Sequence, residues 1–175
     1  MTQVVIGLGS NIQPEQNLFS AVQQLRDVYD DLVISPVYQS AAQGFIGADF
    51  WNLVAIFNTA TTLSAVAQAL RLIEVRHGRP QPSVKFSDRT LDIDILLFGD
   101  CIGEHAGRFL PRQDILQYGF VLRPLCDLLP DALHPVRQQT YAALWAEFPT
   151  SEHLISPLPS EKQSVFSGFF RRDRV

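Results

Sequence analysis

The chain has 175 residues, of which 46% are hydrophobic and 18% are charged, with a formal net charge of −4 at neutral pH. These values are typical of one soluble domain with a hydrophobic core, and they exclude a disordered chain or a coiled coil. The acidic balance and the lack of about 20 consecutive apolar residues predict no broad nucleic-acid-binding surface and no membrane span, while a local basic site for a small anion stays compatible with them.

The two cysteines, Cys101 and Cys126, do not form a CxxC pair. A disulfide framework or a zinc site is therefore not expected, and the sequence is typical of a reducing compartment. The first ten residues lack the basic segment and the long apolar run of a signal peptide. We expect a cytoplasmic protein.

The first predicted elements are a strand, a helix and a second strand. Apolar residues alternate over residues 4–8 and predict a strand that ends in a tight turn at residues 9–11. Pro14 suits the first turn of a helix, and apolar residues recur at helical spacing up to residue 28. Residues 32–38 predict the second strand, bent at Pro36.

A strand, a helix and another strand follow. Residues 50–57 are apolar and aromatic, as in a buried strand. Thr62 is the expected N-cap of a helix that stops at Gly78, and residues 79–89 form a long loop before a strong strand at 91–98. The order strand-helix-strand-strand-helix-strand predicts an α+β fold with a mostly antiparallel sheet, the ferredoxin-like split βαβ arrangement.

The last part of the chain adds elements to this unit. A turn near Pro111 and two short helices, at about 122–129 and 141–148, are expected. We predict one domain at 1–148 and a C-terminal tail at 149–175 that is not a separate domain. The prolines and serines of the tail favour a loose segment, and the alternative is an arm that docks its phenylalanines on a neighbouring molecule.

The most informative residues are two aspartates inside the strand at 91–98. Asp92 and Asp94 alternate with apolar residues, so both carboxylates project from one face of the strand and can reach a common point. Aspartate is a poor strand former, and two buried negative charges without a partner are costly. A pair of carboxylates that binds magnesium would explain the pattern. The alternative is a strand with one face in water.

Basic residues accumulate immediately before this strand, at Arg71, Arg76, Arg79, Lys85 and Arg89. Arginine and lysine side chains match phosphate oxygens, so a basic loop that leads into a carboxylate strand indicates MgATP. The alternative is a solvated helix face on which Arg71 pairs with Glu74. This alternative does not account for Arg79 and Arg89, which lie outside the helix.

Other nucleotide-binding motifs are missing. The sequence contains no glycine-rich phosphate loop ending in GK[ST]. The segment Gly7-Leu8-Gly9 lacks the third glycine and the acidic partner of a dinucleotide fingerprint, and we interpret it as part of a turn.

Residues 88–99 (DRTLDIDILLFG) closely resemble the signature RTLDLDILLFG of the 6-hydroxymethyl-7,8-dihydropterin pyrophosphokinase family. Further segments resemble the family in the same order, at residues 6–11, 35–40, 49–52, 73–79 and 118–125. The resemblance covers about residues 3–148, which it implies are the catalytic domain, and leaves the tail unmatched.

The resemblance implies an activity and its partners. Members of the family transfer the pyrophosphoryl group of ATP to the hydroxymethyl oxygen of a reduced pterin and release AMP, which serves folate synthesis. The expected partners are therefore ATP and the reduced pterin, and we expect a monomer or a weak homodimer. The implied catalytic residues are Asp92, Asp94, Arg79 and Arg89, with the two aspartates holding two Mg²⁺ ions.

The resemblance also implies two sets of binding residues. The expected nucleotide contacts are Glu74, Arg79, Lys85, Arg89, Ile95 and Arg112. The expected pterin contacts are Ser40, Ala41, Gln43, Phe50, Asn52, Phe86 and Phe120. Phe50 and Phe120 would sandwich the flat ring while Asn52 reads its polar edge, as such a ring requires. From the residues alone, core packing of the two phenylalanines and a strand-end cap at Asn52 stay open.

Five positions depart from the family pattern: Ala41, Gln81, Phe86, Arg112 and Tyr118. Gln81 and Tyr118 replace arginines expected to contact phosphate, and Arg112 restores one positive charge. Loss of a charged hydrogen bond costs about 1.5–3 kcal/mol. We expect an active enzyme with altered nucleotide contacts, either slower or specialised for a related pterin. The rival hypotheses are a non-catalytic regulatory relative that binds pterin or nucleotide, and an assembly subunit that uses its tail.

Overall fold

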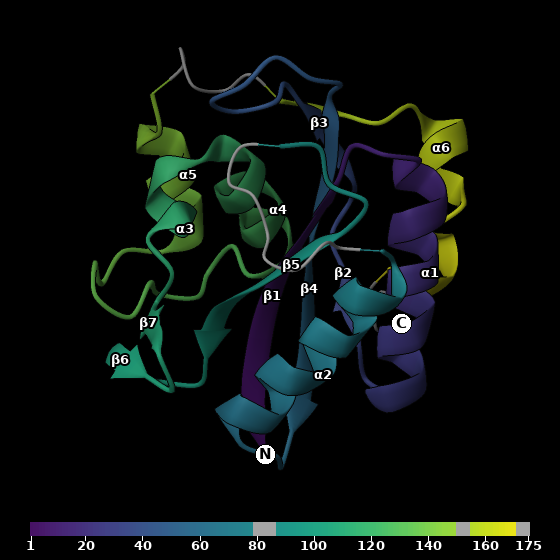
Figure 1. The fold of residues 1–175 in the computed structure, drawn as a ribbon. Coiled ribbons are helices and arrows are strands. Elements are labelled where there is room, and N and C mark those ends of the chain that lie inside the picture. Colours follow the sequence, from purple (N-terminus) through teal and green to yellow (C-terminus); the bar gives the residue numbers. More distant parts are fainter. Residues whose placement is uncertain (79–86, 150–154, 171–175) are drawn as a thin grey trace.

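A central antiparallel sheet organises the molecule, a computed structural model that describes residues 1–78, 87–149 and 155–170 (Figure 1). Its strand order is β5-β1-β4-β3-β8, with β2 also paired to β4. The strands are β1 (Thr2–Ser10), β2 (Val33–Ile34), β3 (Tyr38–Ser40), β4 (Phe50–Thr59), β5 (Asp92–Phe98) and β8 (Ile155–Pro157). The pairings between these strands are all antiparallel, so the predicted α+β class and mostly antiparallel sheet are confirmed.

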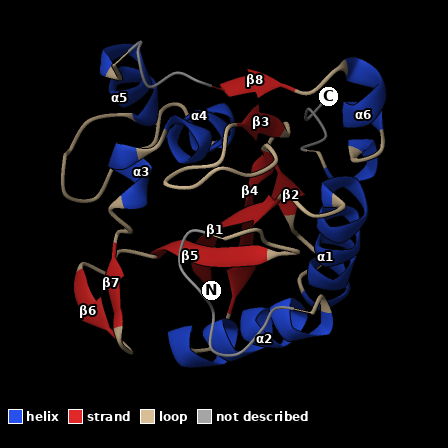
Figure 2. Cartoon of the chain, turned by 45° about the horizontal axis from the view of Figure 1, so that its top comes forward, coloured by secondary structure: helices blue, strands red, loops and turns tan. Residues whose placement is uncertain are grey.

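Helices cover both faces of the sheet (Figure 2). The helices α1 (Pro14–Val28) and α2 (Leu63–Arg76) pack on one face. The other face is covered by α3 (Asp114–Gln117), α4 (Gly119–Leu128) and α5 (Tyr141–Glu147). Thr62 caps α2 as predicted, because its side chain accepts a hydrogen bond from the amide of Ala65 at 3.3 Å.

A small hairpin of β6 (Gly103–His105) and β7 (Arg108–Leu110) follows β5 and was not predicted from the sequence. The predicted second strand is divided into β2 and β3, which lie on either side of Pro36. A proline cannot donate a ladder hydrogen bond, which agrees with the break at this point.

Alternation along the strands divides the buried residues between two cores. Val4, Ile6 and Leu8 of β1 belong to the core beneath α1 and α2, and Val5 belongs to the core beneath α4 and α5. The interpretation of Gly7-Leu8-Gly9 as a turn is wrong, because β1 continues through both glycines to Ser10. Gly7 and Gly9 lie on the same face as Val5.

The alternation of β5 is as predicted up to residue 95 and then changes. Ile93 and Ile95 pack beneath α1 and α2, whereas Leu97 joins the opposite core. The ladder with β1 is irregular at this point, where Ile6 pairs with Ile95 and Val5 pairs with Leu97. The additional residue on β5 reverses the direction of the side chains that follow it.

The prediction of a loose C-terminal tail is wrong for residues 155–170. This segment forms β8, α6 (Ser160–Ser164) and η2 (Ser167–Phe169). Leu158 and Phe166 are buried in the core beneath α1 and α2. The segment therefore packs on its own chain. In the part of the chain that the structure describes, no helix is long and apolar enough to cross a bilayer.

Candidate active site

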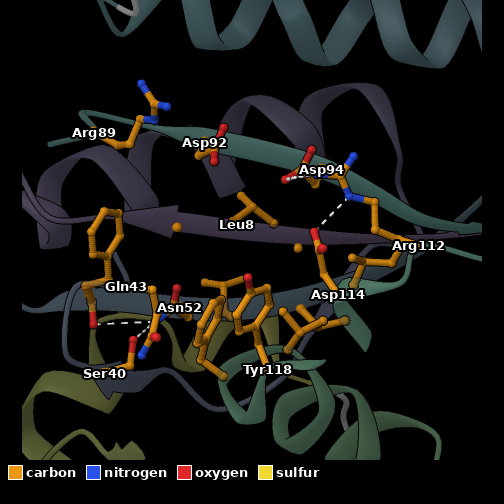
Figure 3. A pocket seen from close by; sticks show the side chains of 18 of the residues that line it. Leu8, Ser40, Gln43, Asn52, Arg89, Asp92, Asp94, Arg112, Asp114 and Tyr118 are labelled. Atoms are coloured by element: carbon orange, nitrogen blue, oxygen red, sulfur yellow. Dashed lines mark hydrogen bonds and ion pairs between the residues drawn. The ribbon is translucent and has the colours of Figure 1, made fainter. Parts of the chain in front are cut away.

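A cavity of about 430 Å³ lies over one half of the sheet, on the face opposite α1 and α2. The other half of that face carries the core beneath α4 and α5. Its lining residues come from β1, β3, β4, β5 and α4 and from the segments 41–45, 87–89 and 112–118 (Figure 3). A single face of the sheet thus provides both a core and a site.

Asp92 and Asp94 follow one another along β5 and both line this cavity (Figure 3). In the sheet they are paired with Gly9 and Gly7 of β1, respectively. Both side chains are half-buried. The predicted projection of two carboxylates from one face of the strand is therefore confirmed, and the face is a cavity wall.

Arg112 extends over the carboxylate of Asp94 from the segment between β7 and α3. Its Nη2 lies 3.2 Å from Oδ2 of Asp94, and its Nε donates to Oδ2 of Asp114 at 2.9 Å. Burial disfavours the charge of this guanidinium, but Asp94, Asp114 and Asp92 outweigh that effect and raise the pKa of Arg112. The site therefore holds a fixed positive charge among three carboxylates.

Arg89, three residues before the start of β5, also lines the cavity. Its backbone amide donates to Oδ1 of Asn11 at 2.7 Å, and its Nη1 donates to Oγ of Ser87 at 3.1 Å. The Nδ2 of Asn11 donates to Asp88 at 2.6 Å and to the carbonyl of Ala48 at 3.1 Å. Buried Asn11 therefore joins the end of β1 to residues 48 and 88–89, which are far apart in the chain.

A polar pair and two aromatic rings form the opposite side of the cavity. Asn52 and Ser40 are buried, and Nδ2 of Asn52 donates to Oγ of Ser40 at 3.0 Å. Phe50 and Phe120 are only partly buried and both line the cavity. Tyr118 stacks on Phe120 with ring centroids 5.0 Å apart and an interplanar angle of 18°.

Of the remaining predicted pterin contacts, two line the cavity and one lies outside the described residues. Ala41 and Gln43 line the cavity and are exposed. Phe86 lies outside the described residues, as do the predicted nucleotide contacts Arg79 and Lys85.

A second, polar cavity of about 220 Å³ lies between α2 and β5. Glu74 and Ile95, both predicted nucleotide contacts, line it together with Arg71 and Arg108. The carboxylate of Glu74 is buried, accepts from the amide of Ile93 at 2.9 Å and pairs with Arg71 at 3.2 Å. Glu74 therefore also holds the edge of β5 against α2.

Asp94 and Arg112 line both cavities. The aromatic and amide-bearing cavity and the polar cavity thus meet at a carboxylate and a guanidinium. Ligands bound in the two cavities would therefore approach one another at this junction.

Sequence reasoning missed several residues of the site: Gly7, Gly9, Asn11, Arg108 and Asp114. The pairing of Arg71 with Glu74, which the sequence offered as an alternative, is present. The glycines form the floor between β5 and β4, since Gly9 pairs with Asp92 on one side and with Asn52 on the other. Alternation with Val5 places them on the face of the carboxylates, a signal that was available in the sequence. The contacts of Asn11 and Asp114 depend on tertiary structure.

Comparison with known proteins identifies the family. Residues 5–130 match the model of the 7,8-dihydro-6-hydroxymethylpterin-pyrophosphokinase (HPPK) family. The chain belongs to the HPPK family. The match includes the described cavity-lining residues from Gly7 to Val121 and ends before α5 and the C-terminal segment.

Two relatives illustrate the range of the family. The 2-amino-4-hydroxy-6-hydroxymethyldihydropteridine pyrophosphokinase of Pseudomonas aeruginosa is 33% identical over 139 residues, which cover 76% of this chain and 84% of that protein. The folic acid synthesis protein fol1 of Schizosaccharomyces pombe is 29% identical over 168 residues, which cover 94% of this chain and 21% of that protein.

Solved structures support the fold. The HPPK-DHPS of Plasmodium falciparum, in its A437G form with pteroate, superposes with a TM-score of 0.66 at 12% sequence identity. The match covers 89% of this chain and 46% of that one, so this chain spans less than half the length of the solved protein. At this identity the likeness extends to the fold alone, and it agrees with the ferredoxin-like arrangement.

Proposed function

We propose that this chain transfers the pyrophosphoryl group of ATP to the hydroxymethyl group of 6-hydroxymethyl-7,8-dihydropterin and releases AMP. The observation that carries the proposal is the junction at Asp94 and Arg112, where a cavity suited to a flat polar ring meets a cavity lined by charged groups. The family match and the names of the relatives support the same activity. The product is an activated pterin of folate biosynthesis.

The larger cavity accounts for binding of the pterin. Phe50 and Phe120 provide apolar faces for a bicyclic ring, and Asn52 provides an amide for its donors and acceptors. Ser40 accepts a hydrogen bond from Nδ2 of Asn52, and this bond fixes the orientation of the amide and therefore of its Oδ1. Asn52 and Asp92 lie on either side of Gly9, so a ring bound by Asn52 would lie beside the carboxylates of β5.

The smaller cavity accounts for the nucleotide. Ile95 and Glu74 lie on either side of it, and Arg108 and Arg112 provide positive charge. We propose that Arg89 and Arg112 bind phosphate oxygens, because guanidinium groups match them two at a time. Arg79 and Lys85, outside the described residues, complete the proposed set of phosphate contacts.

Asp92 and Asp94 fit a magnesium site, and we propose that they hold two Mg²⁺ ions. The donors are hard carboxylate oxygens on one wall of the cavity, and the described residues contain no cluster of three or more His, Cys, Asp or Glu side chains that could hold a metal alone. Such a site suits magnesium, which keeps water and phosphate oxygens among its ligands. When bound, the ions neutralise the charge of the triphosphate and orient it.

The proposed reaction needs placement more than covalent chemistry. The hydroxymethyl oxygen attacks the β-phosphorus and gives up its proton to water, the bond from that phosphorus to the oxygen bridging to the α-phosphate breaks, and AMP leaves. The proposed role of the chain is to bring the two substrates together at the cavity junction. Arg112, which lines both cavities, and Arg89, which lines the larger one, support this role.

The test is an assay of AMP. Incubation of the protein with MgATP and the reduced pterin should release AMP continuously, and omission of the pterin should abolish the release. Assays with several reduced pterins would identify the preferred substrate. Tight binding of both substrates without AMP would instead support the non-catalytic relative and overturn the proposed enzyme.

A further inference from the structure

The C-terminal arm, residues 155–170, follows a path across the outside of β3 and onto α1 (Figures 1 and 2). Its first segment, β8, is the outermost strand of the sheet. Its last segment places Phe166 and Phe169 edge-to-face on Phe19 of α1, with ring centroids 6.2 Å and 5.8 Å apart. Phe166 is fully buried. The arm is thus anchored at its far end.

At its other end the arm pairs with the strand β3 along the whole length of that strand. Residues Tyr38, Gln39 and Ser40 pair with Pro157, Ser156 and Ile155, respectively. These three residues are the whole of β3. Because β8 pairs with all of them, β3 is an internal strand of the sheet instead of an edge strand. An edge strand this short gains much of its order from its neighbours.

A single side chain of the arm extends this contact to the residue before β3. Gln163 of α6 accepts from the amide of Val37 at 3.0 Å and donates to the carbonyl of the same residue at 2.7 Å. The amide of Leu158 donates to that carbonyl as well, at 3.0 Å. Gln163 therefore acts on Val37 as an additional strand residue would.

The strand β3 connects the arm to the larger cavity. Ser40 at its end accepts from Asn52, the amide proposed to read the pterin edge. Tyr38 at its start donates to Asp127 of α4 at 2.6 Å, and Nε of Arg123 donates to the tyrosine oxygen at 3.2 Å. Phe120 lies at the start of the same helix. A displacement of β3 would therefore move both the amide and an aromatic wall.

We propose that the arm is a positioning element that holds β3 in place and so determines the affinity for the pterin, with Gln163 as its main contact. The inference rests on the proposed function, since it assigns the larger cavity to the pterin. The nucleotide cavity is lined by α2, β5 and residues near β7 and contacts neither β3 nor the arm. The arm should therefore affect one substrate and not the other.

Steady-state kinetics of the full chain with Gln163→Ala test this selectivity. The KM for 6-hydroxymethyl-7,8-dihydropterin should rise about five- to tenfold, as expected for partial loss of two hydrogen bonds. The kcat and the KM for ATP should change less than about twofold. Glu161→Ala, on the exposed side of α6, is the matched control and should leave all three constants unchanged.

Hydrogen exchange gives a readout that needs no substrate. Backbone amides of residues 37–40 should exchange faster in Gln163→Ala than in the unaltered protein, while amides of β1 and β5 keep their rates. Gln163→Glu should resemble Gln163→Ala, because it replaces the donor to the Val37 carbonyl by a second acceptor. Removal of the whole arm is not used, since it would expose the core beneath Phe166.

Three results would be decisive against the proposed role or its premise. Unchanged pterin KM and unchanged exchange at residues 37–40 would overturn the role of the arm. Equal increases in both KM values, with faster exchange throughout the sheet, would reduce it to a general stabiliser and also overturn it. Failure of the unaltered protein to release AMP would overturn the proposed function. The exchange experiment would still test whether the arm holds β3 in place, because it needs no substrate.

Discussion

Asn52 of β4 and Asp92 of β5 are both paired with the same residue of β1, Gly9. Adjacent strands are about 4.8 Å apart, so the pterin-reading amide and the metal-binding carboxylate of the proposed site are separated by about two strand spacings. The residue between them has no side chain, which leaves this width of the sheet open as a cavity floor.

Substitution Gly9→Ala should weaken pterin binding. A Cβ at this position would lie 3.2 Å from Oδ1 of Asn52 and 3.8 Å from Cδ1 of Phe50, so the amide must shift. We expect a pterin KM raised by about tenfold, or about 1.4 kcal/mol. Gly7→Ala places its Cβ at an ordinary 3.5 Å from Leu96 and should have a smaller effect. A larger effect of Gly7→Ala would contradict the role of Gly9.

Substitution Asp92→Ala should reduce turnover by about two to three orders of magnitude, because it removes a proposed metal ligand at the place where the pyrophosphoryl group is transferred. Its side chain is half-buried beside the cavity, so the fold should be retained, as circular dichroism would show. Asp100→Ala, on the exposed turn after β5, is the control and should keep full turnover. Near-full activity of Asp92→Ala would refute the metal assignment.

Arg112 should matter through the shape of its guanidinium as well as its charge. It contacts Asp94 and Asp114 through different nitrogens, and lysine has only one. Both Arg112→Ala and Arg112→Lys should raise the KM for ATP by about tenfold or more, with Arg112→Lys recovering only part of the loss. Isothermal titration with a non-hydrolysable ATP analogue measures the same difference without turnover. Full recovery by lysine would show that charge alone suffices.

The stability of the protein should decrease below neutral pH because of His134. Its Nδ1 accepts hydrogen bonds from the amides of Val136 and Arg137 at 3.2 and 3.1 Å. Burial, followed by the charge of Arg137, lowers the pKa of His134 in the folded chain. Below a pH of about 6.5, the usual pKa of histidine, His134 is therefore protonated to a greater extent in the unfolded chain than in the folded one. The free energy of unfolding falls as the pH decreases through this range.

Urea titrations at several pH values between about 5 and 8 measure this dependence. His134→Asn keeps an acceptor and cannot be protonated in this range, so its stability should fall less steeply toward acid. Identical slopes for the two proteins would exclude His134 as the source.

Periodicity was sufficient for most of the fold. The alternation of β1 and β5 and the helical spacing of α1 and α2 are local properties of the chain, and together they predict the antiparallel split βαβ unit. The signature around Asp92 and Asp94 was equally local, so the carboxylate wall of the cavity was predicted from the sequence. The interpretation of Gly7 and Gly9 as a turn was wrong, because glycine composition outweighed a strand pattern that continues through both residues.

By itself, then, the sequence determined the order of strands and helices in the split βαβ unit, the family and the pair of carboxylates, since these follow from spacing and motifs within single segments. Only the tertiary structure decided that Arg112 and Asp114 approach Asp94, that Asn11 joins two cavity segments, and that the arm packs on β3. These contacts join residues that are far apart in the chain or lie on irregular segments. Local periodicity carries no information about such pairs, because their energy depends on the packing of the whole molecule.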